Sequence, residues 1–463
     1  MKNGSTTGEL MAALRSTVRD LLPGDRLPSS RDLMAEHQVG PGTVARAIAR
    51  LTAEGLVVTR PGSGTFVAPK ASAKGDPADT GWQTVALTDR AVDTRPLIDV
   101  LGEPSPDTIL LDGGYLHRSL QPVRALSAAL ARAARRPDAW DRAPVNGLAP
   151  LRAVFATAAG PGIGPDDVLI TAGGQSALSL VFRAIAGPGN PVLVESPTYP
   201  GALAAARAAG LSPVPVPMDA DGVRPELLAD AFAMTGARVF YCQPSHHNPT
   251  GAVLPPERRR QVVEVARAAG AFVIEDDFAR HLGHGGPMPR SLLAEDRDGT
   301  VVQLTSLTKP AAPSLRIGAL VARGPVMDRM RAVRHVDDFF VSRPLQEAAL
   351  ELVSAPAWDR HLRTLAVALR ERCRELANAI ERERPDWSVT RVPTGGLHLW
   401  VRLPTGPGGS MVTASAARRQ AVAVSAGHRY FAAEAPAAYL RMGFAATADR
   451  ADLSDAVRRL ASI

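Results

Sequence analysis

Seven short runs of β-forming apolar residues recur between residues 168 and 321, and helical stretches separate several of them. Strands that alternate with helices in this way are typical of a mostly parallel sheet covered by helices. Ligands of such sheets gather at the carboxyl ends of the strands. The alternation therefore predicts an α/β body with a mostly parallel seven-stranded sheet, whose strands are Val168–Thr171, Val192–Glu195, Val214–Val216, Val239–Cys242, Phe272–Glu275, Val301–Leu304 and Ile317–Val321.

Composition excludes several classes of protein. The chain has 463 residues, of which 45% are hydrophobic and 21% charged, as in a folded globular protein. No run approaches the roughly 18 apolar residues of a membrane span. The polar first residues, 1–7, lack the charged and apolar regions of a signal peptide. Two cysteines, Cys242 and Cys373, are too few for a disulfide scaffold or a cysteine-based zinc site. We therefore expect a cytoplasmic protein with no membrane partner.

Three segments differ in composition along the chain. Residues 1–68 are compact and patterned, and residues 96–463 hold the alternating strands and helices. Residues 69–95 between them are small, polar and contain proline and glycine, which predicts an exposed linker. We therefore expect an N-terminal domain, a linker and a C-terminal body with these bounds.

The first segment predicts three helices followed by a β-hairpin. Apolar residues recur at helical spacing in residues 10–21, Ser29 or Ser30 can cap a second helix, and a third helix ends at Gly55. Helix, tight turn, helix and hairpin form the arrangement of a winged helix-turn-helix domain. The hairpin consists of two short strands around a glycine-rich turn, at residues 56–60, 61–64 and 65–67.

In a winged helix-turn-helix domain the third helix lies in the major groove of double-stranded DNA. Its outward side chains contact bases or phosphates, and nearby arginines contact the backbone. A net charge of +7 permits binding to a polyanion without proving it, and a protein-interaction domain with solvated arginines is the alternative. The candidate DNA-binding residues are Thr43, Arg46 and Arg50 on the third helix, together with Arg31, Arg60, Gly62 and Gly64.

Four short motifs favour the DNA-binding interpretation. They are Leu27–Arg31, Thr43–Val44, Glu54–Val57 and Gly62–Val67. On these residues the segment resembles the DNA-binding domain of GntR-type transcription regulators over its whole length.

Lysine is rare in this chain, and one lysine stands apart. Of the 53 basic residues only four are lysines, and Lys309 is the only one that follows Lys74. Arginine does not deprotonate to attack a carbonyl group, whereas a desolvated lysine amine does. A lysine retained in an arginine-rich body therefore hints at Schiff-base chemistry, although single surface lysines are also common.

Polar and small residues follow the predicted strands and could complete a cofactor site together with Lys309. The turn at residues 171–175 opens a helix whose free N–H groups suit a phosphate. An aldehyde cofactor with a phosphate and a pyridine ring also needs an amine, a carboxylate near the ring nitrogen and an aromatic side chain. The later strands lead to residues 195–201, 243–251, 274–278 and 306–309.

The stretch from about residue 100 to 463 resembles the fold type I, aminotransferase-like family of pyridoxal phosphate (PLP) proteins. The match rests on the ordered set Tyr199, Asn248, Asp276, Lys309 and Arg316. The resemblance implies an internal aldimine at Lys309 and an Asp276 carboxylate paired with the pyridinium nitrogen. It also implies that Asn248 hydrogen-bonds the phenolic oxygen and that Tyr199 stacks on the ring. The phosphate would be held by Gly174, Gln175, Ser306, Thr308 and Arg316.

Residues 393–400 and 439–444 resemble the smaller C-terminal domain of the same family. We place this α+β subdomain at about residues 345–463. The resemblance implies that Arg441 binds the carboxylate of a substrate or effector.

Some assignments keep a structural alternative. Asp276 could cap a helix or loop beside Asp277, and Tyr199 could be a core aromatic residue. His246 and His247 have no further ligands at metal-binding spacing, so we expect a loop role for them and no metal site.

One position departs from the family pattern. The family usually carries a tyrosine two residues after the aspartate that pairs with the ring, and this chain has Phe278. Phenylalanine packs but cannot donate a hydrogen bond to the phenolic oxygen. We therefore expect an altered aldimine pKa and poor turnover, which Phe278→Tyr would reverse.

A GntR-like head joined to an aminotransferase-like body resembles the MocR subfamily of bacterial regulators. The resemblance implies a sensor whose PLP, or a PLP adduct with an amino compound, changes how the heads engage an operator. It also implies head-to-tail homodimers. Two further classes stay open: an active aminotransferase that carries a DNA-binding head, and a DNA-binding dimer whose body binds no PLP.

Overall fold

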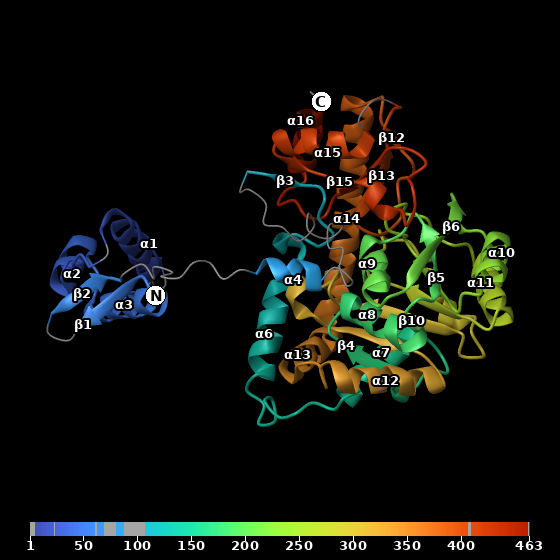
Figure 1. Ribbon diagram of the computed structural model, residues 1–463, viewed down its shortest axis with the longest axis horizontal. Coiled ribbons are helices and arrows are strands. Elements are labelled where there is room, and N and C mark those ends of the chain that lie inside the picture. Colours follow the sequence, from blue (N-terminus) through green and yellow to red (C-terminus); the bar gives the residue numbers. More distant parts are fainter. Residues whose placement is uncertain are drawn as a thin grey trace. The chain divides into compact units, whose positions relative to one another are not determined.

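The computed structural model describes residues 5–22, 24–60, 63–68, 80–87, 107–405, 409–461 and 463. The chain divides into two compact units, residues 1–91 and 92–463. Figure 1 shows the described elements of both units.

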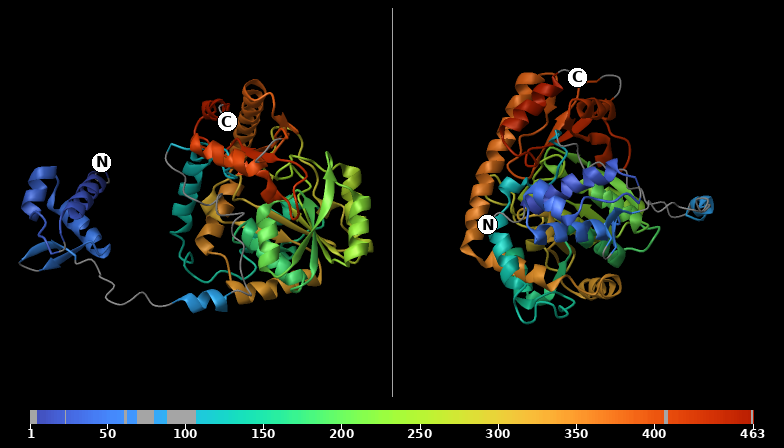
Figure 2. Two further views of the ribbon diagram at one scale, coloured as in Figure 1. Left: turned by 45° about the horizontal axis from the view of Figure 1, so that its top comes forward. Right: turned by 90° about the vertical axis from the view of Figure 1, so that its left-hand side faces the viewer.

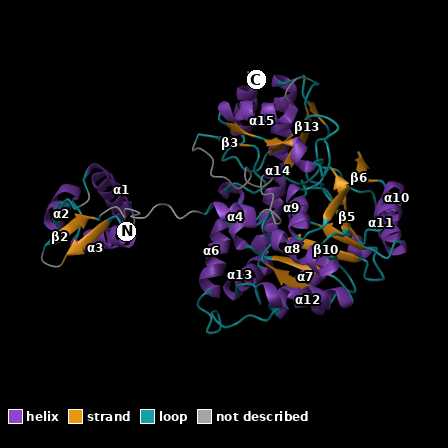
Figure 3. Ribbon diagram, viewed as in Figure 1, coloured by secondary structure: helices purple, strands orange, loops and turns teal. Residues whose placement is uncertain are grey.

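The described residues 5–68 of the N-terminal unit form three helices and a two-stranded antiparallel sheet (Figures 1 and 3). Its core contains Leu10, Leu14, Leu33, Val44 and Leu51, which are buried on the apolar faces that helical spacing predicts. The predicted winged helix-turn-helix fold is confirmed. Its elements are α1 (Ser5–Asp20), α2 (Ser30–His37), α3 (Pro41–Ala53), β1 (Val57–Arg60) and β2 (Gly64–Val67).

Ser29, and not Ser30, caps helix α2. The Ser29 hydroxyl accepts a hydrogen bond from the Asp32 N–H at 3.3 Å, and the Asp32 carboxylate accepts one from the Ser29 N–H at 3.1 Å. This reciprocal pair satisfies N–H groups that the first turn of a helix leaves without partners.

The predicted linker contains one described stretch, residues 80–87. It forms the short helix α4 (Gly81–Ala86), which the sequence reasoning did not foresee. Trp82 and Leu87 are exposed here, as an exposed linker requires. The bounds of the linker stay a prediction.

The body contains an eight-stranded sheet with the order β4-β11-β10-β9-β8-β5-β6-β7. Neighbouring strands from β10 to β6 are parallel, and β11 runs antiparallel to both of its neighbours. All seven predicted strands are present, and the two-residue β7 adds an eighth at one edge. The strands are β4 (Val168–Thr171), β5 (Pro191–Ser196), β6 (Ser212–Asp219), β7 (Gly222–Val223), β8 (Val239–Cys242), β9 (Phe272–Asp276), β10 (Val301–Ser306) and β11 (Gly318–Val321).

A hydrophobic core covers each face of this sheet, because successive side chains of a strand point to opposite faces. Ile170 and Phe240 belong to the core under α7, α10, α11 and α13, whereas Leu169 and Tyr241 belong to the core under α8, α9 and α12. The helices are α6 (Val123–Ala133), α7 (Ala149–Ala159), α8 (Gly174–Ile185), α9 (Pro200–Ala208), α10 (Pro225–Thr235), α11 (Pro256–Ala268), α12 (Pro325–Asp337) and α13 (Arg343–Ser354).

A smaller α+β subdomain contains a four-stranded sheet with the order β12-β13-β16-β15. The long helix α14, orange in Figures 1 and 2, runs from the region of the large sheet to this subdomain and packs there with α16. The elements are α14 (Pro356–Glu383), β12 (Ser388–Val389), β13 (His398–Arg402), α15 (Gly409–Arg419), β14 (Val422–Ala423), β15 (Ser425–Ala426), β16 (Tyr439–Gly443) and α16 (Ala451–Leu460).

The first described residues of the body also belong to the core of the small subdomain. Strand β3 (Ile109–Leu110) pairs in parallel with β14, and Leu111 is buried in the same core. The bounds predicted for the subdomain, about 345–463, do not include this segment. No described helix is both long enough and apolar enough to cross a membrane.

Candidate cofactor site and DNA-binding surface

A cavity of about 350 Å³ lies at the carboxyl ends of the parallel strands of the body. It brings together every residue that the sequence reasoning assigned to the cofactor or its ligand. These residues lie on strands, helix starts and loops that are far apart in the sequence, so the fold gathers them. They are Gly174, Gln175, Tyr199, Asn248, Asp276, Ser306, Thr308, Lys309, Arg316 and Arg441.

Lys309 follows strand β10 and points toward the N-terminal segment of the body. Its Nζ donates a hydrogen bond to the Gly114 carbonyl at 2.6 Å and lies 3.9 Å from the centre of the Tyr115 ring. Burial, and then the positive charge of Arg441, lower the pKa of Lys309 to about 7, although Asp276 acts in the opposite direction. A large share of this amine is therefore neutral near pH 7, as a nucleophile requires.

Asp276 ends strand β9 at the floor of the cavity. Its Oδ2 accepts hydrogen bonds from the Tyr241 hydroxyl at 2.6 Å and the Gln243 amide at 2.9 Å. Its Oδ1 is buried without a partner among the described residues. Burial raises the pKa of Asp276, and the two donors oppose this shift. A buried acceptor without a partner is costly, so Oδ1 is suited to an N–H donor of a ligand.

The start of helix α8 forms an anion site. Gly173 has a φ of 85°, and a Cβ built there would lie 2.9 Å from Arg316 Nη2 and 3.1 Å from Thr308 Oγ1. The Thr308 hydroxyl is buried without a partner among the described residues. Helix N–H groups that begin at Gly174, a guanidinium and a hydroxyl thus converge, which is the donor set that a phosphate requires.

Four further predicted residues line the cavity. The Tyr199 hydroxyl donates to Gln175 Oε1 at 3.2 Å, and Ser306 Oγ accepts the N–H of Thr308 at 3.1 Å. Burial raises the pKa of Tyr199, so its hydroxyl stays protonated. Tyr199 also packs against the core under α8, so its place in the core and its place in the cavity coexist. The Oδ1 atom of Asn248 is buried without a partner in the described structure.

Arg441 lies on strand β16 and is 4% exposed. One guanidinium nitrogen is 3.0 Å from His398 Nε2, another donates to the Asp112 carbonyl, and the group lies 5.6 Å from the Tyr430 ring centre. Burial, and then Arg441, hold the pKa of His398 well below its usual range, so its neutral ring accepts at Nε2. Arg441 is thus a fixed cation in the cavity wall.

The predicted DNA-contacting residues of the head lie on its surface. Thr43, Arg46 and Arg50 are spaced by three and four residues on α3 and therefore share one face of the helix. Arg46 and Arg50 are exposed, and Arg46 contacts the Thr43 hydroxyl at 3.4 Å.

The remaining predicted DNA-contacting residues lie on α2 and the wing. Arg31 is exposed on α2, and Arg60 is exposed at the end of β1, with its guanidinium 5.1 Å from the Phe66 ring centre. Gly64 pairs with Arg60 across the hairpin. Gly62 lies outside the described residues.

Two known families match this chain. The aminotransferase class I and II family matches residues 114–460, and the gntR family of bacterial regulatory proteins matches residues 6–67. The HTH-type transcriptional regulator YdcR of Escherichia coli is 31% identical over 82% of this chain and 82% of its own length. The chain belongs to the MocR-type GntR regulators.

Enzymes also resemble the body of this MocR-type regulator. The 2-aminoadipate transaminase of Thermus thermophilus is 31% identical over 77% of this chain and 89% of its own length. The structure of LysN, an α-aminoadipate aminotransferase of the same organism, in complex with N-(5'-phosphopyridoxyl)-L-leucine, has a TM-score of 0.76 and 29% identity. The match covers 82% of this chain and 97% of the LysN chain.

PLP, the cofactor of the aminotransferase family, fits the cavity of this regulator. Each part of the cofactor has a matching group in the cavity. Asp276 Oδ1, which has no partner among the described residues, would meet the ring nitrogen. The Lys309 amine, which is hydrogen-bonded to the Gly114 carbonyl, would meet the aldehyde, and the start of α8 with Thr308 and Arg316 would hold the phosphate.

Several residues of the cavity, and the buried Tyr241 that contacts Asp276 from the core, were missed by the sequence reasoning. Tyr241 and Gln243 alternate along and beyond β8 toward the face that carries Asp276, and this period-two pattern could have found them. Tyr115, His398 and Tyr430 also line the cavity, and no spacing relates them to Lys309 in the sequence.

Phe278 lines the same cavity and is buried. The position at which this chain departs from the family pattern therefore faces the cavity, where the hydroxyl of a tyrosine could reach the cofactor. The expected effect on the cofactor stays a prediction.

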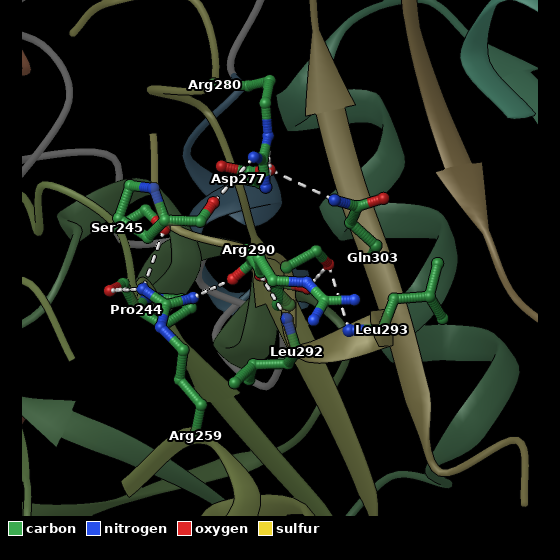
Figure 4. Close-up of polar contacts among 12 residues, drawn as sticks. Pro244, Ser245, Arg259, Asp277, Arg280, Arg290, Leu292, Leu293 and Gln303 are labelled. Atoms are coloured by element: carbon green, nitrogen blue, oxygen red, sulfur yellow. Dashed lines mark hydrogen bonds and ion pairs between the residues drawn. The ribbon is translucent and has the colours of Figure 1, made fainter. Parts of the chain in front are cut away.

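A buried charge network lies on the other side of strand β9 (Figure 4). Asp277 accepts hydrogen bonds from Arg280 at 2.5 Å and Gln303 at 3.1 Å, and Glu275 accepts them from Ser291 and from the Leu292 N–H at 3.0 Å. Burial, and then the charge of Asp277, raise the pKa of Glu275 to about 7.

Arg259 of α11 completes this network from the neighbouring helix (Figure 4). It donates to the carbonyls of Leu254, Arg290 and Pro244 and to the Ser245 hydroxyl. Arg259 thus ties together the loops that follow β8 and β9 and so fixes the strand ends that carry Asn248 and Asp276.

The two loop histidines are buried between polar neighbours. His247 Nε2 lies 3.3 Å from the Glu195 carboxylate, and burial lowers the pKa of His246 to about 4. Among the described residues, no three or more His, Cys, Asp or Glu side chains are grouped so as to hold a metal ion.

Proposed function

We propose that this chain is a PLP-dependent transcription regulator whose body senses PLP, an amino compound, or both, through Lys309. One observation supports this most strongly. A lysine whose pKa is lowered to about 7 lines the same cavity as Asp276, whose Oδ1 has no partner among the described residues, in a chain that also carries a DNA-binding head. The first feature suits covalent capture of an aldehyde, and the second suits control of transcription.

When bound, PLP supplies an electrophilic aldehyde and an electron-withdrawing ring. The residues of the chain hold it in place. Lys309 would provide the attacking amine, Asp276 would hold a proton at the ring nitrogen, and Asn248 would bind the phenolic oxygen. Tyr199 would pack on the ring, and the phosphate would be held by Gly174, Gln175, Ser306, Thr308 and Arg316.

The contacts of Lys309 and Arg441 suggest how a ligand influences the head. Lys309 donates to the Gly114 carbonyl and Arg441 to the Asp112 carbonyl, and this segment follows the linker along the chain. A ligand that engages the amine and the guanidinium competes for both donors. Such a ligand regulates DNA binding only if its affinity differs between the arrangement of the protein that can bind DNA and the arrangement that cannot.

The proposed assembly is a head-to-tail homodimer that binds operator DNA in the cytoplasm. Trp140, Val336 and Phe339 are large exposed apolar residues of the body, which is the kind of surface that a partner subunit covers. In the heads, Arg46 and Arg50 would contact the major groove, and Arg31 and Arg60 the phosphates. We assign the head to residues 1–68 and the linker to residues 69–95.

An active aminotransferase with a DNA-binding head is the second candidate. The cavity contains the full set of Lys309, Asp276, Asn248 and Arg441, and the similarity to a transaminase supports it. Steady-state exchange of amino groups with a keto acid would favour an enzyme, and a single slow half-reaction would favour a sensor. A body that serves only for dimerisation would bind no PLP.

Footprinting on the upstream region of the gene tests the proposal. We expect PLP, or PLP with an amino compound, to change the DNA affinity of the wild type at least tenfold and to leave that of Lys309→Ala unchanged. The control is pyridoxine, which lacks both the aldehyde and the phosphate. An equal response of wild type and variant would contradict the proposal.

A further inference from the structure

The two side chains that bind Asp276 both donate to the same carboxylate oxygen. The Tyr241 hydroxyl lies 2.6 Å and the Gln243 amide 2.9 Å from Oδ2, whereas Oδ1 has no partner among the described residues. Both oxygens of a carboxylate can accept hydrogen bonds. The one-sided arrangement therefore holds the carboxylate in one orientation and leaves Oδ1 for a ligand.

Both partners of Oδ2 are fixed as donors. Burial raises the pKa of Tyr241 well above its ordinary value, so the hydroxyl keeps its proton. The Gln243 Oε1 accepts the N–H of Asn248 at 3.1 Å, and this bond turns the NH₂ group of the same amide toward Asp276. A backbone N–H cannot accept, so the amide gains nothing by turning over. Two fixed donors on one carboxylate favour its charged form.

Tyr241 reaches Asp276 from the hydrophobic core. Its side chain is fully buried in the core under α8, with its ring centre 6.2 Å from that of Phe182. Gln243 lines the cavity, but Tyr241 is not among the described residues that do. A phenylalanine would fill such a position, as Phe240 does next to it on β8, and a buried hydroxyl is costly unless it is bonded. The Tyr241 hydroxyl thus acts on a ligand only through Asp276.

We propose that Tyr241 is a positioning residue: its hydroxyl keeps Asp276 ionised, and the ring nitrogen of the bound cofactor therefore keeps its proton. This inference rests on the proposed function, because it requires the cofactor ring beside Asp276. One proton is shared between Oδ1 and the ring nitrogen. Donors to Oδ2 weaken the hold of the carboxylate on that proton, so it stays on nitrogen. Without the Tyr241 hydroxyl, the proton moves toward Oδ1.

The opposing effects on Asp276 support this role. Burial raises the pKa of Asp276, and the hydrogen bond from Tyr241 is the largest of the contributions that oppose burial, ahead of that from Gln243. The pair of donors thus offsets part of the cost of holding a charge inside the protein.

Pyridoxamine phosphate tests the inference without a covalent bond to Lys309 and without turnover. With ¹⁵N at its ring nitrogen, and bound to the full chain, we expect the NMR signal of a protonated ring in the wild type. In Tyr241→Phe the signal should move toward that of an unprotonated ring. This variant keeps the aromatic ring in the core and removes only the hydroxyl.

A second measurement uses a deaza analogue of pyridoxamine phosphate, in which a C–H group replaces the ring nitrogen. By calorimetry, the wild type should prefer pyridoxamine phosphate to this analogue. In Tyr241→Phe the preference should fall roughly tenfold, as expected for the loss of one hydrogen bond to a charged group.

Two further variants complete the test. Tyr439→Phe removes the hydroxyl of a half-buried tyrosine that is not among the described lining residues, and it should keep the wild-type signal and preference. Gln243→Met removes the other donor and should shift both readouts in the direction of Tyr241→Phe, which keeps the test open if that variant folds poorly.

The outcomes separate this inference from the proposed function. An unchanged ¹⁵N signal in Tyr241→Phe with pyridoxamine phosphate bound would show that Tyr241 only fills the core. An unprotonated ring in the wild type would equally overturn the inference. If pyridoxamine phosphate does not bind the wild type at all, the proposed function itself fails.

Discussion

The cations that we assign to the function of the head and of the body lie in opposite environments. In the head, Arg46 and Arg50 are exposed on one face of α3. In the body, Lys309 lies in a cavity, where burial and Arg441 lower its pKa to about 7. Contact with a phosphate needs a group that keeps its charge in water, whereas capture of an aldehyde needs one that can lose it. The choice between arginine and lysine therefore follows the chemistry of each site.

Exchanging lysine for arginine in the body should have a larger effect than exchanging arginine for lysine in the head. Lys309→Arg keeps a positive charge but removes the amine that attacks an aldehyde, so we expect covalent attachment of PLP to fall by more than 100-fold. The near-visible absorption of the bound cofactor measures this loss. The reciprocal change, Arg50→Lys, keeps the charge on α3 and should weaken DNA binding by only about threefold. If Arg50→Lys lost DNA binding by as large a factor as Lys309→Arg loses PLP attachment, the proposed difference between the two sites would be wrong.

Removing charge from the head should have the next largest effect. Arg46→Ala combined with Arg50→Ala removes two contacts, so we expect DNA affinity to fall roughly 10- to 100-fold and the salt slope to decrease by about 2. Affinity measured across a salt series checks both numbers. Arg402→Ala, at an exposed position of the body, is the control. An unchanged salt slope in the double variant would show that α3 does not face the DNA.

The pH dependence of PLP attachment should distinguish the buried Lys309 from an ordinary, solvated lysine. Because the pKa of Lys309 is lowered to about 7, its neutral fraction rises about tenfold per pH unit below pH 7 and levels off above it. We expect the attachment rate measured by stopped-flow absorbance to follow this curve. A rate that keeps rising toward pH 10 would show an ordinary, solvated lysine.

The same lowered pKa has a consequence for stability. Between pH 7 and the ordinary lysine value of 10.5, the unfolded chain binds a proton that the folded chain does not. Lys309 therefore makes the folded body more stable as the pH rises through this window. Lys309→Met should remove that contribution to the unfolding free energy measured with denaturant.

The smallest expected effect concerns the cap of helix α2. Ser29→Ala removes a reciprocal pair of hydrogen bonds at the surface, so we expect the unfolding free energy of the head to fall by about 1 kcal/mol. Ser30→Ala is the matched control, because Ser30 begins the helix and does not cap it. Equal losses in the two variants, measured by thermal unfolding, would contradict the capping assignment.

Much of the fold could be predicted from the sequence because its signals are local. Strand β9 and its neighbours are short runs that are almost wholly buried and rich in apolar residues, and α3 keeps its apolar face at helical spacing. Lys309 was recognisable because the rest of the body uses arginine for positive charge. The short elements β7 and α4 were missed, since two or six residues carry too little pattern to be recognised.

The partners of Lys309 could not be predicted, because tertiary folding alone supplies them. The Gly114 carbonyl that accepts its hydrogen bond is 195 residues away in the chain. Likewise His398, which touches Arg441, comes from the next strand of the small sheet, and only the register of β13 with β16 brings them together. Neither pair leaves a spacing that a reader of the sequence could recognise.

Reduction with borohydride in the presence of PLP, followed by peptide mapping, shows which lysine captures the cofactor. We expect a single phosphopyridoxyl group, attached at Lys309, in nearly every chain. Modification confined to Lys2, Lys70 or Lys74, with residue 309 untouched, would contradict it and leave only a DNA-binding protein.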